Sequence, residues 1–399
     1  MQGDGTERVF FFGCWNRDGC VEDRPDYRAA VLAAVRSEQQ GWSRGLVAGD
    51  NIYPEKGNDK TKTVYMRTLE SGFRMLTDVN VANPVVVGLG NHDVECADVL
   101  ADMMRLGSVN LEVTHVGPSE TFERLYLIDT NVDRQDDGAW ADMIDGLDEW
   151  LDRRPPDEWL FVMGHEPIMA LKQKKDRVCT DPLPRAERLL GAMSKRRCVY
   201  LCADVHNFQV GAFHAPGAPN PVFQVVSGTG GASPDPMKAF FAESPVGESG
   251  WKLRQTASMQ PYGYCILDVP SKNEPLSLTY VMVAPSEPDH NSDSSGSDDS
   301  DSSTPCGKFG FTLGGDEADV TRLGQKLEFC RPVSNRGPRA ACVSGNGQPN
   351  DEPYICDKFK GGGGGRSAAG TAGTAGTVGA AASLGLITLL CSATGAWRA

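Results

Sequence analysis

Two polar loops, each directly after an apolar run, constrain this chain more than any other feature of the sequence. The loop Gly49-Asp50-Asn51-Ile52-Tyr53 follows the run 45–48, and the loop Gly90-Asn91-His92-Asp93 follows the run 84–89. Short apolar runs rich in β-forming residues indicate buried strands, and the ligands of α/β folds gather at the carboxyl ends of strands. Either loop alone also fits an ordinary turn. Together they carry the oxygen and nitrogen donors that metal ions prefer.

The same arrangement recurs at three further apolar runs. Polar residues follow the runs 8–13, 159–163 and 198–202, at Cys14 and Asn16, at His165, and at Asp204, His206 and Asn207. Helical patterns alternate with these runs, one opening at Pro25 and others at 63–76, 98–106, 139–151 and 184–193. Further strands are expected at 109–113, 122–128, 223–226, 264–269 and 276–283. Strands that alternate with helices over short turns predict parallel pairing, with helices packed against the sheet.

The composition is that of a globular protein. Hydrophobic residues make up 40% and charged residues 23% of the 399 positions, so a sizeable core can be buried. The apolar stripe of the helix 139–151 is expected in that core, and it consists of Trp140, Ile144, Leu147, Trp150 and Leu151. The formal net charge of −14 argues against a nucleic-acid partner, because phosphate backbones require clustered Lys and Arg. A small phosphorylated substrate is compatible with this charge, since a bound metal supplies positive charge locally.

The 12 cysteines are unevenly distributed. A short C-terminal segment contains Cys306, Cys330, Cys342 and Cys356. This density predicts two disulfides and an oxidising compartment, with all three pairings of the four thiols open. A zinc site is the alternative, although no Cys-x2-Cys spacing occurs in the segment.

Shifts in composition divide the chain into parts. We expect a folded domain at 1–285, an acidic Ser/Asp linker at 286–304, a small Cys-rich segment at 305–357, a Gly/Ala/Thr-rich tether at 358–377 and an apolar tail at 378–397. The tether and tail match the layout of a glycolipid-anchor signal; a disordered low-complexity tail and a marginal membrane span are the alternatives. An anchor predicts a lipid-anchored protein of the cell surface or secretory pathway. Residues 1–7 show no secretory signal, so either the sequence lacks its start or the protein is not secreted.

The order of the loops resembles that of a known family. The patterns Gly-Asp-Asn-x-Tyr, Gly-Asn-His-Asp, Gly-His-x-Pro and x-x-x-His-Asn are similar to those of the calcineurin-like metallophosphoesterases, and Tyr53 points to the purple (tartrate-resistant) acid phosphatase branch. The stretches 127–131, 150–151 and 226–231 look similar too, so the resemblance covers about residues 8–285. It implies a four-layer α-β-β-α sandwich of two mixed sheets, to which the small Cys-bearing C-terminal segment is added.

The resemblance also implies roles for the loop residues. By analogy with the family, Asp50 bridges two metal ions, Cys14, Tyr53 and His206 hold one of them, and Asn91, His165 and Asp204 hold the other. His92 is the expected catalytic residue, and Asn16 and Asn207 are expected to line the site. The ions are divalent or trivalent, with iron, zinc and manganese as candidates.

Two cations on a shared carboxylate suit phosphoester hydrolysis. They neutralise the charge of the phosphoryl oxygens and lower the pKa of a bound water, which yields hydroxide near neutral pH. An imidazole beside them acts as an acid or an electrostatic stabiliser. The expected function is therefore a metal-dependent phosphatase acting on a small phosphorylated substrate or a phosphoprotein.

Three positions depart from the family pattern. Members of the family carry Asp where this chain has Cys14, Gly or His where it has Asn16, and His where it has Asp204. A thiolate still binds zinc or iron, and a carboxylate favours harder ions such as manganese or magnesium. Alternatively, Cys14 pairs with Cys20 and Asp204 caps a turn. The chain would then be a surface-displayed binding or structural protein on a degraded phosphatase scaffold.

Overall fold

The computed structural model of the chain describes residues 6–17, 27–53, 62–94, 111–174, 177–235, 243–259, 262–272, 274–283, 305–314 and 321–323. The helix expected at 98–106, the acidic linker, the tether and the apolar tail lie outside these residues, as do Cys330, Cys342, Cys356 and the side chain of Cys306. The disulfides and the lipid anchor therefore stay predictions. None of the described helices is long and apolar enough to cross a membrane.

The first of two 8-stranded sheets joins a parallel half to an antiparallel half. Its order is β18 (Thr321–Leu323), β17 (Pro305–Leu313), β16 (Leu276–Val283), β15 (Gly263–Val269), β1 (Glu7–Phe12), β2 (Arg44–Ala48), β3 (Val85–Gly88) and β4 (Leu111–Val113). Strands β1 to β4 are parallel, and β15 to β18 pair antiparallel, with β15 beside β1. Three strands of the parallel half, β1, β2 and β3, carry the predicted loops of Cys14, Asp50 and Asn91 at their carboxyl ends.

The second sheet is mixed in the same way. Its order is β13 (Glu243–Val246), β14 (Trp251–Met259), β11 (Phe208–His214), β12 (Val222–Ser227), β10 (Arg197–Cys202), β7 (Trp159–Met163), β6 (Leu125–Leu127) and β5 (Gly117–Pro118). Its parallel part is β12, β10, β7 and β6. A small separate hairpin pairs β8 (Leu171–Lys174) with β9 (Arg177–Cys179).

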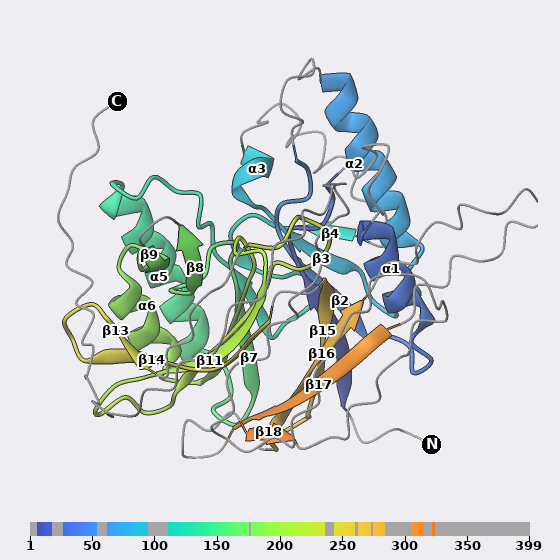
Figure 1. Cartoon of the computed structure of the whole chain (residues 1–399). Coiled ribbons are helices and arrows are strands. Elements are labelled where there is room, and N and C mark those ends of the chain that lie inside the picture. The colour runs from blue at the N-terminus through green and yellow to red at the C-terminus, as the bar shows by residue number, and fades with distance from the viewer. Residues whose placement is uncertain are drawn as a thin grey trace, which may run out of the picture. The chain divides into compact units, whose positions relative to one another are not determined.

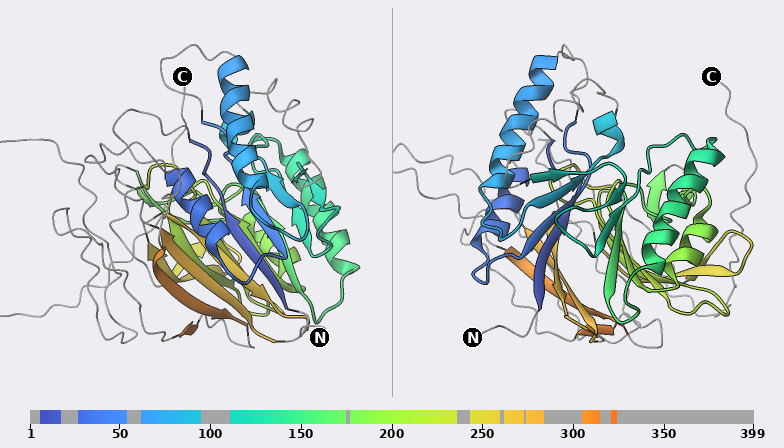
Figure 2. Two further views of the ribbon diagram at one scale, coloured as in Figure 1. Left: turned by 90° about the vertical axis from the view of Figure 1, so that its right-hand side faces the viewer. Right: turned by 180° about the vertical axis from the view of Figure 1, so that it is seen from behind.

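Helices cover the outer face of each sheet (Figure 1). Helices α1 (Tyr27–Ser37) and α2 (Lys62–Thr77) lie on one side, and α5 (Asp137–Asp152) and α6 (Ala186–Met193) lie on the other; the one-turn helix α3 (Asn91–Val94) follows β3 (Figure 2). Alternation along β1 separates the layers, because Val9 and Phe11 are buried between the sheets while Phe10 and Phe12 pack with α1 and α2. The expected four-layer α-β-β-α sandwich is confirmed.

The apolar stripe of α5 lies in the core as expected. Its residues pack in one buried cluster with β7, β10 and α6. The helix begins at a side-chain cap, where Asp136 Oδ1 accepts a hydrogen bond from Ala139 N at 2.9 Å. The stripe therefore contributes to core packing, and the candidate site residues lie on the loops.

The first sheet continues past the boundary expected at residue 285. Strand β17 pairs with β16, and its Phe311 and Leu313 are buried in the core between the sheets. The rings of Phe311 and Phe208, from opposite sheets, lie 5.8 Å apart between centroids. The cysteine spacing drew attention to this segment as a disulfide unit, but its alternating Phe309, Phe311 and Leu313 are the pattern of a half-buried strand.

The crossover from β4 to the second sheet is held by a single carboxylate. Glu112 accepts hydrogen bonds from Thr114 Oγ1 at 2.8 Å, Ser119 Oγ at 2.9 Å and the N–H groups of Glu120 and Thr121 at 2.9 and 3.0 Å. Burial opposes ionisation of this half-buried group, but hydrogen bonds from Thr121 and Thr114 outweigh it and lower the pKa of Glu112.

Replacing Glu112 with Gln is expected to lower the melting temperature by a few degrees at neutral pH. Because the folded-state pKa of Glu112 is depressed, its stabilisation is full above the ordinary value of 4.5 and is lost as pH falls through the folded-state pKa. Thermal unfolding from pH 7 to pH 3 should show the difference from wild type shrinking in acid. The exposed Glu120→Gln is the control. A difference independent of pH contradicts the role of the charge.

Candidate metal centre

The five predicted loops meet at one edge of the two sheets. They follow strands β1, β2, β3, β7 and β10, at Cys14, Asp50, Asn91, His165 and Asp204. Backbone hydrogen bonds join neighbouring loops, from Cys14 N to Gly49 O at 3.0 Å and from Ala203 N to His165 O at 2.8 Å. The carboxyl ends of the parallel strands of both sheets therefore bring the predicted residues together, as expected for α/β folds.

The backbone is strained at three of these positions. Cys14, Asp50 and Asp204 have φ angles of 52°, 55° and 50°, a region that side-chain-bearing residues seldom adopt. Among the described residues, Arg185 is the only other non-glycine residue with positive φ. Such strain persists where the surrounding structure enforces it, and it clusters at functional sites.

A first group of donors is formed by Cys14, Asp50 and His206. One ligand atom from each lies within 4.8 Å of the other two, and no second group of this kind occurs among the described His, Cys, Asp and Glu residues. The Tyr53 hydroxyl lies 3.3 Å from His206 Nε2. His206 Nδ1 lies 2.8 Å from Ser233 O, so the ring is oriented with Nε2 toward the group. These are the four residues expected to hold the first ion.

A second group shares Asp50 with the first. His165 Nε2 lies 3.2 Å from Asp50 Oδ1 and 3.1 Å from Asn91 Oδ1, while its Nδ1 donates to Ala48 O at 2.7 Å. Burial opposes a charge on His165, but the adjacent Asp50 carboxylate outweighs it and raises the pKa of His165 to about 10. The same pairing holds the pKa of Asp50 well below its usual range, against the effect of burial. Asp50 Oδ1 and Asn91 Oδ1 both face His165 Nε2, and this arrangement fits a cation. A cation bound there would be coordinated by both oxygens and by Nε2 of a neutral imidazole.

Cys14 is a free, buried thiol. Its alternative disulfide partner, Cys20, lies outside the described residues. Burial, and next the charge of Asp50, raise the pKa of the Cys14 thiol well above its ordinary value. A cation on the same group would favour the thiolate, because metals bind cysteine in that form. The residue types of the first group thus fit a zinc or iron ion.

Asp204 is placed differently from the other predicted ligands. Its Oδ2 pairs with Lys172 Nζ at 3.3 Å, and the same ammonium lies 3.6 Å from Asp235 Oδ2. Asp235 in turn accepts a hydrogen bond from His206 N at 2.9 Å. Neither Lys172 nor Asp235 was expected from the sequence, since no motif marks them and the contacts depend on the β8–β9 hairpin.

Asp93 joins the loop of Asp50 to the loop of Asn91 and His92. It accepts hydrogen bonds from Asn51 N at 2.8 Å, Asn51 Nδ2 at 2.9 Å and Gly90 N at 2.7 Å. Burial, and next the charge of Asp50, raise the pKa of Asp93 to about 7. Asp93 belongs to one of the two loops whose oxygen and nitrogen donors suggested a metal site, and in the structure its oxygens bind the backbone and amide of the neighbouring loops. Asp93 is therefore a positioning residue.

The two asparagines expected to line the site have hydrogen-bond partners within the protein. Asn16 Nδ2 donates to Asn51 O at 2.7 Å and to Thr68 O at 3.1 Å, and Asn16 Oδ1 accepts from Arg28 at 2.6 Å. Asn207 Oδ1 accepts from Gln209 Nε2 at 2.7 Å. Both residues are fully buried. These contacts give both asparagines a role in supporting the loops.

His92, the expected catalytic residue, lies beside the first group. Its N–H donates to Asp50 Oδ1 at 3.2 Å, and its ring stands 4.7 Å from that of Tyr53 between centroids. His92 is only partly buried. A group in this place reaches both the donors and the solvent.

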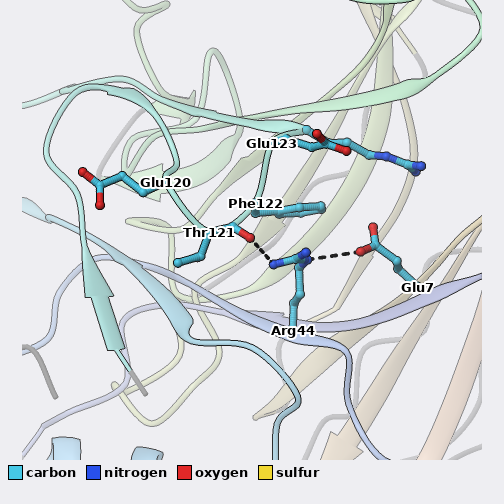
Figure 3. A pocket seen from close by; sticks show the side chains of 7 residues that line it. Glu7, Arg44, Glu120, Thr121, Phe122 and Glu123 are labelled. Carbon is cyan, nitrogen blue, oxygen red and sulfur yellow. Dashed lines mark hydrogen bonds and ion pairs between the residues drawn. The ribbon is translucent and has the colours of Figure 1, made fainter. Parts of the chain in front are cut away.

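A separate cavity of about 500 Å³ opens at the opposite edge of the sheets, where β1 and β2 begin (Figure 3). Arg44 crosses it, bonded to Thr121 O and 3.2 Å from Glu7 Oε1, with its guanidinium over the Phe122 ring. Its central polar groups therefore satisfy one another, and none belongs to the predicted loops.

Comparisons with known proteins bear on this arrangement. Residues 8–189 match the sequence model of the calcineurin-like phosphoesterases. Similar solved structures include purple acid phosphatase PPD1 from yellow lupin (Lupinus luteus; 14% identity, 70% of this chain and 52% of that chain, TM-score 0.48). They also include GAP50, the anchor in the inner membrane complex of Plasmodium (14%, 69% and 84%, TM-score 0.45), and PhoD (12%, 83% and 73%, TM-score 0.48). The chain spans about half the length of the lupin structure, and no curated protein matches it in sequence.

Proposed function

The chain carries a calcineurin-like phosphoesterase domain over residues 8–189, and on that premise we propose that it is a metal-dependent phosphoester hydrolase. The observation that carries the proposal is that Asp50 lies between the two groups of donors. Its carboxylate contacts His165 at 3.2 Å and also belongs to the group with Cys14 and His206. A carboxylate between two donor groups is the arrangement that holds cations against a phosphoryl group.

The residues at this edge fit bound cations. Cys14, Asp50, Tyr53 and His206 would hold a first ion, and Asn91 and His165, with Asp50, are the donors available to a second. A bound ion would neutralise phosphoryl charge and lower the pKa of water near the substrate. The thiol of Cys14 favours zinc or iron over the harder manganese.

The protein's own groups supply the remaining chemistry. The backbone N–H of His92 bonds Asp50, and its ring lies beside that of Tyr53 at the margin of the donor group. From this position its imidazole can protonate the leaving oxygen of an ester bound there. Asp93 keeps the loops of Asp50 and His92 together through its hydrogen bonds to Asn51 and Gly90. The substrate is proposed to be a small phosphorylated ester or a phosphoprotein, whose leaving group receives that proton.

Replacing His92 with Ala is expected to lower kcat for an aryl phosphate by about 10²–10⁴-fold, because general acid catalysis contributes that much. The metal content should stay at the wild-type value, since the hydrogen bond to Asp50 comes from the backbone N–H of His92 and His92 is not a predicted ligand. Chelation should abolish hydrolysis by the wild-type protein. His115→Ala is the matched control, because His115 likewise carries an imidazole but pairs with Asp129, at 3.0 Å, and neither residue is a predicted ligand. A metal-loaded wild-type protein inert toward mono- and diesters would reject the proposal.

The ion pair between Lys172 and Asp204 favours a second candidate function. With Asp204 held by Lys172, the centre has fewer ligands than that of an ordinary phosphoesterase. In this second candidate the centre is too weak for turnover, and the domain serves as a binding or structural protein on this scaffold. Restoring the family residues with Cys14→Asp and Asp204→His separates the two. A large gain in metal content and rate supports the second candidate, and loss of an existing rate supports the first.

A further inference from the structure

Lys172 brings a positive charge to the margin of the donor groups. It lies on the β8–β9 hairpin, outside all five predicted loops. Its ammonium stands between Asp204 Oδ2 at 3.3 Å and Asp235 Oδ2 at 3.6 Å. All three side chains are mostly buried, with exposed fractions of 29%, 25% and 23%. In such surroundings an ion pair is screened less by solvent than at the surface.

The location of this pair connects it to the metal centre. Asp204 follows β10 at the position where the family pattern places a metal ligand, and Asp235 holds His206 N at 2.9 Å. The ammonium therefore pairs with Asp204, the carboxylate expected to bind the second ion, and is linked to His206 through Asp235. Two carboxylates surround one ammonium, so the local charge remains negative and does not favour an anion such as phosphate.

We propose that the Lys172 ammonium takes the place of a metal ion at Asp204, so that this chain holds one tightly bound metal ion, on Cys14, Asp50, Tyr53 and His206. The proposal rests on the proposed function, because it concerns the same centre. Asn91 and His165 then offer only neutral donors to a second ion, and the carboxylate of Asp50 is shared with the first.

The test counts ions in the full chain. Protein equilibrated with Zn²⁺ and then dialysed is expected to contain one ion per wild-type chain by elemental analysis. Lys172→Met keeps most of the length of the side chain, removes the charge and releases Asp204, so this variant should contain two ions. Titration calorimetry should show affinity at the second position rising at least about tenfold, which is the scale of one altered ligand contact.

Lys195→Met is the matched control. Lys195 also bridges two carboxylates, Asp148 at 2.6 Å and Asp152 at 3.6 Å, but it follows α6 and pairs with partly exposed residues of α5. It should leave one ion per chain. A Lys172→Met variant that still holds one ion overturns the proposal.

Asp204→Asn provides a second, independent variant. Asn tolerates the φ of 50° at this position, so the loop should keep its conformation. If Asp204 serves Lys172 and not a metal, this variant keeps one ion per chain, and loss of that ion overturns the proposal. Two tight ions on the wild-type chain also overturn it while leaving the proposed function intact. One ion without hydrolysis rejects the proposed function alone, and no bound ion rejects both.

Discussion

Replacing Asp50 with Asn is expected to remove the bound metal and to lower phosphoester hydrolysis by about 10³-fold or more. Asp50 is the carboxylate common to both donor groups, 3.2 Å from His165 Nε2 and within 4.8 Å of the ligand atoms of Cys14 and His206. Asn keeps the size of the side chain and an oxygen that can accept the His92 N–H bond. It also tolerates the φ of 55°. The change therefore removes the charge with little disturbance to the loop.

Elemental analysis and steady-state kinetics measure this result, and thermal unfolding without metal checks that the fold is retained. Asp129→Asn is the matched control. Asp129 is likewise a mostly buried carboxylate paired with an imidazole, that of His115 at 3.0 Å. Its hydrogen-bond partners Asn131 and Met143 are not predicted ligands. Wild-type metal content and rate in Asp50→Asn would show that the shared carboxylate is not the basis of the centre.

Replacing Gly90 with Ala is expected to push the loop of Gly90 and Asn91 away from the loop of Asp50. A Cβ at this position would overlap Asp50 N and Oδ1 and lie 2.8 Å from His165 Cε1. Gly90 has little room to move, because its N–H is bound to Asp93 Oδ2 at 2.7 Å. Overpacking of this kind lowers the free energy of unfolding by about 1–3 kcal/mol. Metal affinity should fall as well, because both clashing partners are predicted ligands.

Gly191→Ala is the control for this substitution. Gly191 lies in helix α6, and a Cβ there meets no atom within 4 Å. Alanine should stabilise the helix by about 0.5–1 kcal/mol. Denaturant unfolding and metal titration of both variants give the comparison. A Gly90→Ala protein as stable and as metal-loaded as wild type would mean that the loops are not packed as the structure shows.

Strands with an uninterrupted apolar run were predictable from the sequence. Strands that contain polar residues, buried only because another element supplies hydrogen-bond partners, were not. The runs before Asp50 and Asn91 are buried on both faces, which requires uninterrupted apolar residues. Strand β11 was missed because Gln209 and Gly211 interrupt its pattern. Gln209 is nevertheless buried, since its amide binds the backbone of Leu171 on β8. Strand β17 was missed because its cysteine suggested a separate segment.

The sequence alone determined which side chains stand where the parallel strands end, because a buried strand needs an apolar run and its end is marked by the first polar residues. The tertiary structure decided which of those side chains face one another. Asp93 reaches Asn51 across 42 positions and Lys172 reaches Asp204 across 32, and no local pattern records such contacts. Hydrogen bonds and ion pairs form wherever folding brings buried polar groups within reach, since leaving them unpaired is costly. Folding thus turned Asp93 into a support for the loops and gave Asp204 an ammonium as its partner.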